Sequence, residues 1–461
     1  MAEGWAAGEL QAQFGDKRLH KRLMRIVEDL AAKPTASVPE ACGHWRATQA
    51  TYRFWDSERV TAEAIRASHL KSTEERVEDT AFVLAIQDTT DLNLSHHPAT
   101  AGLGPLDHPA LRGLKVHSVL GVSEEGMPLG LLHQAVWARD TEQVGQRHQR
   151  RKRETKDKES QRWLTALQAS EAAVPEGATV VTVADREADL YDLFALTRRQ
   201  GSELLIRAAH DRRVNEVGLL RETVQQAPVV GQVVLTVQRK EDHPARQAMM
   251  SVRFRQVYVQ PPRHRRVRSS LPAAAMNVVW TQEEAPPAGV TPVQWLLLTT
   301  VPVNHWADAL RCIRWYSYRW LIERYHFVLK SGCRLEDLQL EAAERIQRAL
   351  ATYCIVAWRL LWLTYKARRS PEAPCSCALE THEWQALYGT IYRTPVPPAE
   401  PPTLQQALRW IAQLGGFLGR TSDGQPGVKT IWRGIRRLDD IAATWQLLRA
   451  PLPAQVDTTY G

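Results

Sequence analysis

Hydrophobic residues recur at helical spacing near the start of the chain, at Leu19, Leu23, Ile26, Val27 and Leu30. Spacings of three and four place these residues on one face of a helix, and Pro34 ends that helix. A second helical stretch carries Trp45, Tyr52, Phe54 and Trp55. Arginine and lysine residues are interleaved in both stretches. Residues 1–70 therefore indicate a helical module whose basic surface is either a solvated face or, as we favour, a DNA-binding face.

The middle of the chain alternates between strand and helix patterns. Two apolar runs of strand length, AFVLAIQD and ATVVTVAD, end in Asp88 and Asp185. Between them, GLKVHSVLGV and MPLGLLHQAVWAR flank Ser-Glu-Glu-Gly, which predicts a hairpin. A helix over READLYDLFALTRR and a strand over SELLIRAAH are expected after the second aspartate. The pattern predicts a mixed α/β fold over residues 71–210.

Residues 211–299 change character, because runs rich in β-branched and aromatic residues are separated by Pro and Gly. This block indicates a β-rich insertion between two α/β pieces. Residues 304–369 follow a helical pattern, which resumes after Pro-rich linkers. The charged run 147–159 indicates a solvated loop and the start of a helix, with a DNA-contacting loop as the alternative. The run 263–268 is typical of a hairpin tip.

Composition narrows the classes of protein that the chain can represent. Its 461 residues, 44% of them hydrophobic, suit two to four folded units. No run approaches the ~18 apolar residues of a membrane span, and no signal peptide is evident, so we expect a cytoplasmic protein with no membrane partner. The net charge of +8 and pI of 9.2 are compatible with a polyanionic partner. The six cysteines are too scattered for a disulfide framework, and Cys375, Cys377 and His382 lack the usual spacing of zinc ligands.

The segment WYSYRWLIERYHFVLKSG combines a charged and an apolar face. If it is one helix, with about 100° per residue, an arc of roughly 60° holds four polar residues, Tyr316, Arg319, Glu323 and Lys330. The opposite side would be apolar and buried. Core packing does not explain a carboxylate flanked by two cations and a phenol, although Glu323 could simply pair with Arg319. The combination suits a site that holds a metal ion and a phosphate group together.

Two further acids fit the same chemistry. Asp88 and Asp185 each close a strand, and with Glu323 they can converge into a cluster that binds two divalent cations. Taken singly, each aspartate is explained as well by a turn or a helix cap. Asp91 competes with Asp88, and Asp189 and Asp192 compete with Asp185. The last two fall within the helix expected next, where they are better explained as surface or first-turn charges. We favour the three-acid cluster because cations surround its third member.

These residues match a known family. The chain resembles bacterial DDE transposases of the insertion-sequence-four family, and among them the Tn-five type. The signature Y-x2-R-x3-E-x6-K is present as Tyr316, Arg319, Glu323 and Lys330. QDTT and ADREAD place the other two family acids at Asp88 and Asp185. Blocks such as YRF, VHSVL, GLLHQ and LGGF also agree in order and context, from about Phe14 to about Arg437.

The resemblance implies a fold and a set of domains. A ribonuclease-H-like α/β catalytic core would occupy 71–210 and 300–370, with a β-strand insertion over 211–299. Residues 1–70 would bind the inverted repeats at the transposon ends. Helical residues 371–461 would pair two protomers into a homodimeric synaptic complex, which also engages target DNA. The protein would act in the bacterial cytoplasm, on the nucleoid.

The resemblance also implies a reaction, cut-and-paste transposition by two-metal phosphoryl transfer. A nick frees a 3′-OH, which attacks the opposite strand to form a hairpin; water reopens the hairpin, and the 3′ end joins target DNA. Asp88, Asp185 and Glu323 would hold two Mg²⁺ ions, with Mn²⁺ as the alternative. Matched positions that would contact DNA or phosphate are Tyr316, Arg319, Lys330, Arg207, Trp295, Arg53 and Lys33. Trp295 would stack on a flipped base, although alone it is explained equally well as a core residue of a strand.

Two other classes of function remain. One is a metal-dependent endonuclease of similar fold that cuts DNA without integrating it. The other is a transposase-derived DNA-binding protein that has no catalysis. The complete set of acids and the separate terminal modules favour the transposase.

Overall fold

The computed structural model describes residues 4–11, 14–108, 110–141, 158–216, 218–237, 245–262 and 271–449. Most of the charged run at 147–159, and all of the run at 263–268, lie outside these residues. The chain forms two compact units. One is His69–His326, and the other combines Met1–Ser68 with Phe327–Gly461.

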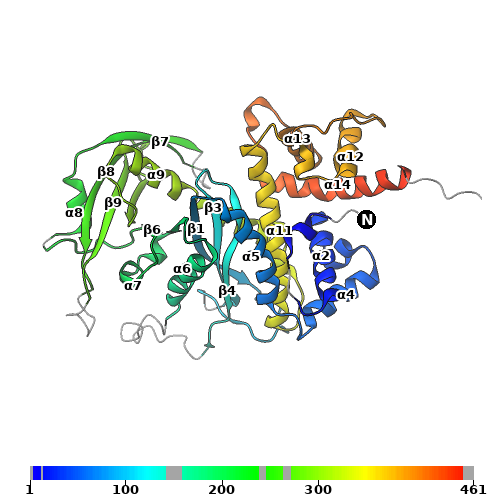
Figure 1. The fold of residues 1–461 in the computed structure, drawn as a ribbon, viewed down its shortest axis with the longest axis horizontal. Helices are drawn as coiled ribbons and strands as arrows, with labels where there is room; N and C mark the ends of the chain where they lie inside the picture. Colours follow the sequence, from blue (N-terminus) through cyan, green and yellow to red (C-terminus); the bar gives the residue numbers. More distant parts are fainter. Residues whose placement is uncertain are drawn as a thin grey trace, which may run out of the picture. The chain divides into compact units, whose positions relative to one another are not determined.

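The unit His69–His326 is built on a mixed sheet (Figure 1). Its strands are β1 (Phe82–Asn93), β2 (Gly104–Pro105), β3 (Arg112–Ser123), β4 (Pro128–Trp137), β5 (Thr179–Ala184), β6 (Ser202–Arg207), β7 (Gly231–Val237), β8 (Arg246–Val259), β9 (Ala274–Glu283) and β10 (Gln294–Thr299). Across the sheet they run β2-β3-β1-β5-β6-β10-β9-β8-β7, and β4 pairs with β3. The β1–β5 and β5–β6 pairs are parallel, and the other neighbours are antiparallel.

The strand predictions are largely confirmed. β3 and β4 form the expected hairpin around Ser123–Gly126, and the mixed α/β character of the unit is as predicted. The β-rich block continues the same sheet, because β10 pairs with β6 and β9, β8 and β7 follow outward. Backbone hydrogen bonds therefore run unbroken from β6 into the block.

Helices cover both faces of the sheet around β1. α6 (Gln161–Ala173) packs on the face that carries Val83 and Ala85, in a buried cluster with Ala166. Side chains alternate along a strand, so Phe82 points to the opposite face. There its ring contacts Trp315 of α9 (Trp306–Ser317), with the ring centroids 5.6 Å apart. Asp88 shares this second face with Phe82, because the two residues are an even number of positions apart.

The helix predicted directly after Asp185 is much shorter than expected. The chain forms a 3₁₀ turn, Arg186–Ala188, and then only a short α7 (Tyr191–Ala195). Asp189 interrupts the helix, because its buried carboxylate accepts hydrogen bonds from the backbone N–H groups of Ala209 and His210 and from Arg212. The prediction of Asp189 as a surface or first-turn charge was wrong, since the residue ties β6 to this turn.

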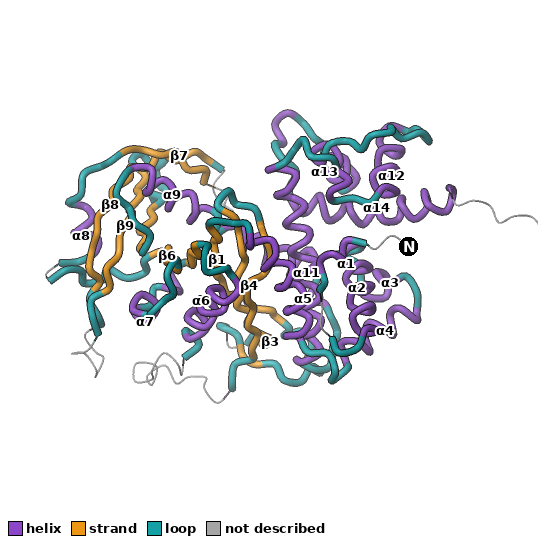
Figure 2. The backbone as a smooth tube through the Cα atoms, viewed as in Figure 1, coloured by secondary structure: helices purple, strands orange, loops and turns teal. Residues whose placement is uncertain are grey.

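The other unit is helical in its described part (Figure 2). Its helices are α1 (Trp5–Glu9), α2 (Lys17–Ala32), α3 (Val38–Cys42), α4 (Trp45–Asp56), the start of α5 (Ala62–Glu78), α11 (Ala343–Arg369), α12 (Thr381–Tyr392), α13 (Leu404–Leu414) and α14 (Val428–Arg449). The buried indole of Trp55 donates a hydrogen bond to Thr352 at 3.2 Å, and Arg348 donates to the Trp55 carbonyl at 2.9 Å. The amino-terminal helices thus pack on α11. No helix among the described residues is both long enough and apolar enough to span a membrane.

Two glycines allow α13 and α14 to approach closely. A Cβ atom at Gly434 would overlap the backbone carbonyl of Ile411, and one at Gly415 would overlap the carbonyl of Thr430. The neighbours at both positions are backbone atoms, which cannot rotate aside. The absence of a side chain at these two positions therefore sets the distance between the helices.

We expect Gly434→Ala to destabilise the helical unit by about 1–3 kcal/mol, because the added methyl forces the two backbones apart. The melting temperature should fall by roughly 3–10 °C in a thermal unfolding experiment. Gly8→Ala is the matched control, because a Cβ at this helical glycine meets no atom within 4 Å. An unchanged melting temperature in Gly434→Ala would show that the helices can separate without cost.

Candidate active site

The parallel pairing of β1 with β5 brings two aspartates into register. The last paired residues are Ile86 and Val183, and Asp88 and Asp185 each lie two positions further on. Residues two apart share a face, and neighbouring strands lie about 4.8 Å apart, so both carboxylates leave the same face at adjacent positions. The Asp88 side chain is only 20% exposed.

The two strands differ beyond this point. The prediction that Asp88 closes its strand was wrong, because β1 continues to Asn93 with β3 as its partner, whereas β5 stops at Ala184. Asp185 also caps the following turn, and its carboxylate accepts a hydrogen bond from the Glu187 backbone at 2.9 Å. Asp185 therefore caps the turn, as the alternative interpretation predicted, and it also lies beside Asp88. Asp91 is paired with Lys115 at 2.8 Å.

The segment that carries the Tyr-Arg-Glu-Lys signature is not one helix. α9 ends at Ser317, two turn residues follow, and α10 (Trp320–Phe327) then begins, while Lys330 lies in a π-helical turn, Val328–Gly332. The prediction of a single 60° arc was therefore wrong. The break arises because the chain turns at Tyr318 and Arg319, where their N–H groups bond three residues back. Even so, Tyr316, Arg319 and Glu323 all come to the same site.

Arg319 links the acids. Its guanidinium forms an ion pair with Glu323 and is largely buried, with 13% of the side chain exposed. Burial opposes its charge, but Tyr316, Glu323 and Asp88 raise the pKa of the guanidinium above its ordinary value. Arg319 thus lies within electrostatic reach of acids from both β1 and α10. The predicted i,i+4 pair is therefore present, and the three-acid cluster stays a prediction.

Tyr316 lies between the acids and a second arginine. Burial raises the pKa of its phenol, and Arg319 and Arg207 partly offset this effect, while Asp185 adds to it. The hydroxyl is buried; Arg207 lies near enough to donate to it, but no described residue accepts its proton. Arg207, the last residue of β6, donates to the Gln294 carbonyl at 2.8 Å. Trp295 packs edge-on against the Tyr316 ring with centroids 5.0 Å apart, and it is half-buried.

Carboxylates on a shared face suit a hard divalent cation. Within the described ranges, no three His, Cys, Asp or Glu side chains are grouped closely enough to hold a metal ion as they stand. Glu323 is turned to Arg319. To bind the same ion as the two aspartates, Glu323 would have to break its ion pair with Arg319 or keep it through one carboxylate oxygen.

The remaining predicted phosphate and DNA contacts lie in the helical unit. Lys330 pairs with Glu336 at 3.4 Å. Lys33, at the end of α2, pairs with Asp440 at 2.8 Å and Asp439 at 3.5 Å. Arg53 is exposed in the last turn of α4.

Three family models match the chain in succession. Residues 2–60 match "Transposase DNA-binding", residues 155–359 match "Transposase DDE domain", and residues 355–449 match "Transposase Tn5 dimerisation domain". The chain belongs to the DDE transposases of the Tn5 type. The expected ribonuclease-H-like fold with helical terminal regions is confirmed, and the transposase is a metal-dependent enzyme of DNA cleavage and strand transfer.

The match to the DDE domain includes two of the three acids. Asp185 and Glu323 lie inside the match to the DDE domain, whereas Asp88 lies before it begins. The hypothesis that Asp88 belongs to the same site therefore depends on its register with Asp185 and on its electrostatic interaction with Arg319. DNA binding and dimer formation follow from the other two matches.

Two residues beside the acids were missed from the sequence. His326 is buried on α10, with its Nδ1 3.4 Å from an Asp88 carboxylate oxygen. Its position three residues after Glu323, on the same helical face, could have revealed it. Arg162 on α6 gave no such signal, because its partner Thr89 is 73 residues away in the chain.

Arg162 anchors a chain of hydrogen bonds around Asp88. Its Nε donates to the Thr89 hydroxyl at 2.9 Å, which leaves the hydroxyl proton free to donate to His117 Nδ1 at 2.9 Å. Burial holds the pKa of His117 well below its ordinary value, so this ring is neutral and can accept there. Its Nε2–H then donates to Gln87 at 3.3 Å. Both chain neighbours of Asp88 are held by this network.

The same arginine reaches the second aspartate strand. A further nitrogen of Arg162 pairs with Glu187 at 2.8 Å, and Glu187 lies two residues after Asp185. The Trp163 ring lies against the guanidinium, with its centroid 5.3 Å away. Arg162 therefore links the two segments that carry Asp88 and Asp185, by contacts to Thr89 and Glu187.

We expect Arg162→Ala to weaken Mn²⁺ binding about 10- to 100-fold in a calorimetric titration, since residues that orient metal ligands have effects of this size. Arg162→Lys should restore binding only in part, because an ammonium group cannot supply the forked geometry. The control is Arg255→Ala, whose single long hydrogen bond lies in the β-rich block. Equal Mn²⁺ affinity in Arg162→Ala and the wild type would remove the positioning role.

Proposed function

We propose that the protein is a cut-and-paste transposase that cleaves its own element's ends through a hairpin intermediate and joins them to target DNA. The register of Asp88 with Asp185, opposite the Arg319–Glu323 pair, is the observation that carries the proposal. Carboxylates and cations alternate in this arrangement, as required for holding a metal ion and a phosphodiester together.

Asp88, Asp185 and Glu323 are the proposed metal ligands. They would hold two Mg²⁺ ions, or Mn²⁺ in their place, since carboxylate oxygens suit these hard cations. When bound, the two ions supply activation of the attacking oxygen and stabilisation of the leaving oxygen in an in-line displacement. His326 keeps the Asp88 carboxylate directed into the site by its contact at 3.4 Å.

The cationic and phenolic groups act on the phosphate. Arg319 would exchange its partner Glu323 for the incoming phosphate. DNA binding would thus leave the Glu323 carboxylate able to bind a metal ion. Tyr316 supports this role, because its buried hydroxyl can donate a hydrogen bond that it does not make within the described protein. Arg207 and Lys330 add positive charge for the scissile phosphate and its neighbours.

Trp295 is proposed to stack on a base flipped out near the transposon end. Its half-buried ring rests against Tyr316, so the indole is held rigidly beside the residues that contact the phosphate. Stacking returns about 1–3 kcal/mol per base, which offsets the cost of unstacking. A distorted terminus lets the freed 3′-OH reach the opposite strand and form the hairpin, which water then opens before target joining.

The other parts of the chain have proposed roles as well. Residues 1–70 would bind the end inverted repeats, and exposed Arg53 is available for phosphate contact. Lys33 would have to exchange its acidic partners for DNA. Residues 71–210 and 300–370 form the proposed catalytic core with 211–299 as its insertion, and 371–461 would join two protomers in the synaptic complex. We place the protein in the bacterial cytoplasm, on the nucleoid.

Two lesser alternatives remain, an endonuclease without integration and a DNA-binding protein without catalysis. The first would nick DNA but form no hairpin or joined product. The second would bind the ends and cut nothing. One assay separates all three.

The assay is metal-dependent cleavage of labelled flanking inverted repeats on a denaturing gel. We expect nicks, hairpins and double-strand breaks from the wild type. Asp88→Asn, Asp185→Asn and Glu323→Gln should each slow cutting at least about 1,000-fold, or about 4 kcal/mol in barrier, with end binding retained. Asp91→Asn is the matched control on the same strand, and its cleavage should survive. Near-normal cutting by any of the three variants would exclude that residue from the metal site.

A further inference from the structure

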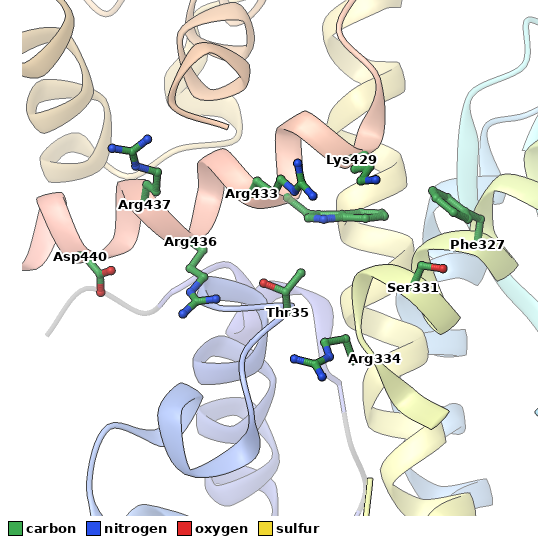
Figure 3. A pocket seen from close by; sticks show the side chains of 10 residues that line it. Thr35, Phe327, Ser331, Arg334, Lys429, Arg433, Arg436, Arg437 and Asp440 are labelled. Carbon is green, nitrogen blue, oxygen red and sulfur yellow. The ribbon is translucent and has the colours of Figure 1, made fainter. Parts of the chain in front are cut away.

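A groove of about 700 Å³ opens in the helical unit, between α14, the turn that follows α10, and the loop after α2 (Figure 3). None of its lining residues belongs to the active site described above. The figure shows Arg436 of α14 and Arg334 of the turn extending toward the space around Thr35, whereas Arg437 points away from Thr35. The question is which ligand such a lining would bind.

The lining is strongly cationic. Five cations border the groove: Arg334, Lys429, Arg433, Arg436 and Arg437. The single acid is Asp440, and Lys33 already pairs with it at 2.8 Å. Thr35 and Ser331 add hydroxyl groups, and the lining includes no Asn or Gln. These groups suit a phosphate-rich ligand and lack the amides that most often read adenine.

The cations of α14 form one stripe. With about 100° per residue, Lys429, Arg433 and Arg436 fall within roughly 60° of one another on the helix. From Lys429 to Arg436 the helix rises about 10 Å, at 1.5 Å per residue. Successive cations of the stripe are therefore about 4.5–6 Å apart along the helix, close enough for the stripe to contact neighbouring phosphates of one strand.

The groove has a rigid aromatic floor. Trp432 is buried and packs against Phe327, with ring centroids 5.5 Å apart. Gly332 permits this arrangement, because a Cβ there would lie 2.8 Å from the indole. The turn after α10 therefore stays close to α14, and the cations above the floor are held in a fixed frame.

The cations differ in how far the protein already satisfies them. Arg334 pairs with Asp337 at 2.7 Å, Arg436 pairs with Glu40, and Arg437 donates to the Leu414 carbonyl at 2.9 Å. Lys429 and Arg433 have neither an ion pair nor a hydrogen bond within the described part of the chain. These two cations, one helical turn apart, are therefore the side chains most readily able to bind an external anion.

We propose that this groove binds the sugar-phosphate backbone of duplex DNA without reading its sequence. The inference rests on the proposed function only in taking DNA as the substrate, and it requires no catalysis. Lys429 and Arg433 would make the principal phosphate contacts, and Arg436 would join them by releasing Glu40. An acidic surface of a second protein copy is the competing occupant, and we disfavour it because the chain has a net charge of +8.

The test is the salt dependence of binding to a fluorescent 30-base-pair duplex of arbitrary sequence, measured by anisotropy without metal. The logarithm of the binding constant falls linearly with the logarithm of salt concentration, with a slope of about −0.9 per phosphate neutralised. Lys429→Gln with Arg433→Gln should therefore reduce the slope by about 1.8. Exchanging the two cation types, Lys429→Arg with Arg433→Lys, should restore it.

The control removes the same charge elsewhere in the helical unit. Lys366→Gln with Arg393→Asn takes away two cations that do not line the groove, and asparagine tolerates the left-handed backbone at Arg393. Its slope should equal that of the wild type. Elution volume and melting temperature confirm that both double variants fold and assemble normally.

The outcomes decide between the occupants. A wild-type slope in the groove variant, or an equal loss in the control, would overturn the proposal. A changed elution volume with an unchanged slope would also overturn it and assign the groove to a second copy. The assay needs no cleavage. A protein inactive in the cleavage assay could still show the groove effect.

Discussion

The parallel hydrogen bonding between β1 and β5 is the constraint on which the active site depends. It fixes Ile86 opposite Val183, and two residues later it delivers Asp88 and Asp185 side by side on one face. A slip of one residue in either strand would turn one carboxylate to the opposite face, into the layer covered by α6. The register is secured by buried side chains on both faces of β1 and by β3 on its other edge.

Charge compensation is the second organising element. Gathering carboxylates at the edge of a buried sheet is costly, because like charges repel in a region of reduced dielectric. Arg319 offsets this cost for Glu323 and Asp88, and Arg162 holds the segments that carry both aspartates. Arg162 comes from α6 on one face of the sheet, and Arg319 comes from the turn between α9 and α10 on the other. The acids are thus supported from both sides.

The helical unit distributes its charges differently. On α14, the acids Asp439 and Asp440 engage Lys33, while the cations nearer the start of the helix line the groove. One helix therefore presents an acidic surface to the end of α2 and a basic stripe to the groove. Gly434 lets this same helix lie close to α13, so the packing of α14 also fixes where its charged side chains lie.

Local pattern was enough to identify much of this protein. Apolar runs indicated β1 and β5, the turn signal indicated the β3–β4 hairpin, and the spacing of Tyr316, Arg319, Glu323 and Lys330 indicated the family. These features depend on residues close together in the chain, where periodicity and turn chemistry leave a readable trace. The family match then extended the prediction to the fold and the reaction class.

Only the tertiary structure decided the features that depend on distant partners. β1 continues past Asp88 because β3 supplies hydrogen bonds there, and the helix after Asp185 is cut short because Asp189 binds backbone groups that follow β6. The signature segment breaks between α9 and α10, although Tyr316, Arg319 and Glu323 still meet. Arg162 reaches Thr89 from 73 positions away. Sequence by itself indicated the family and the residues proposed to carry the chemistry, and long-range pairing, which local propensity does not encode, decided how these residues are held.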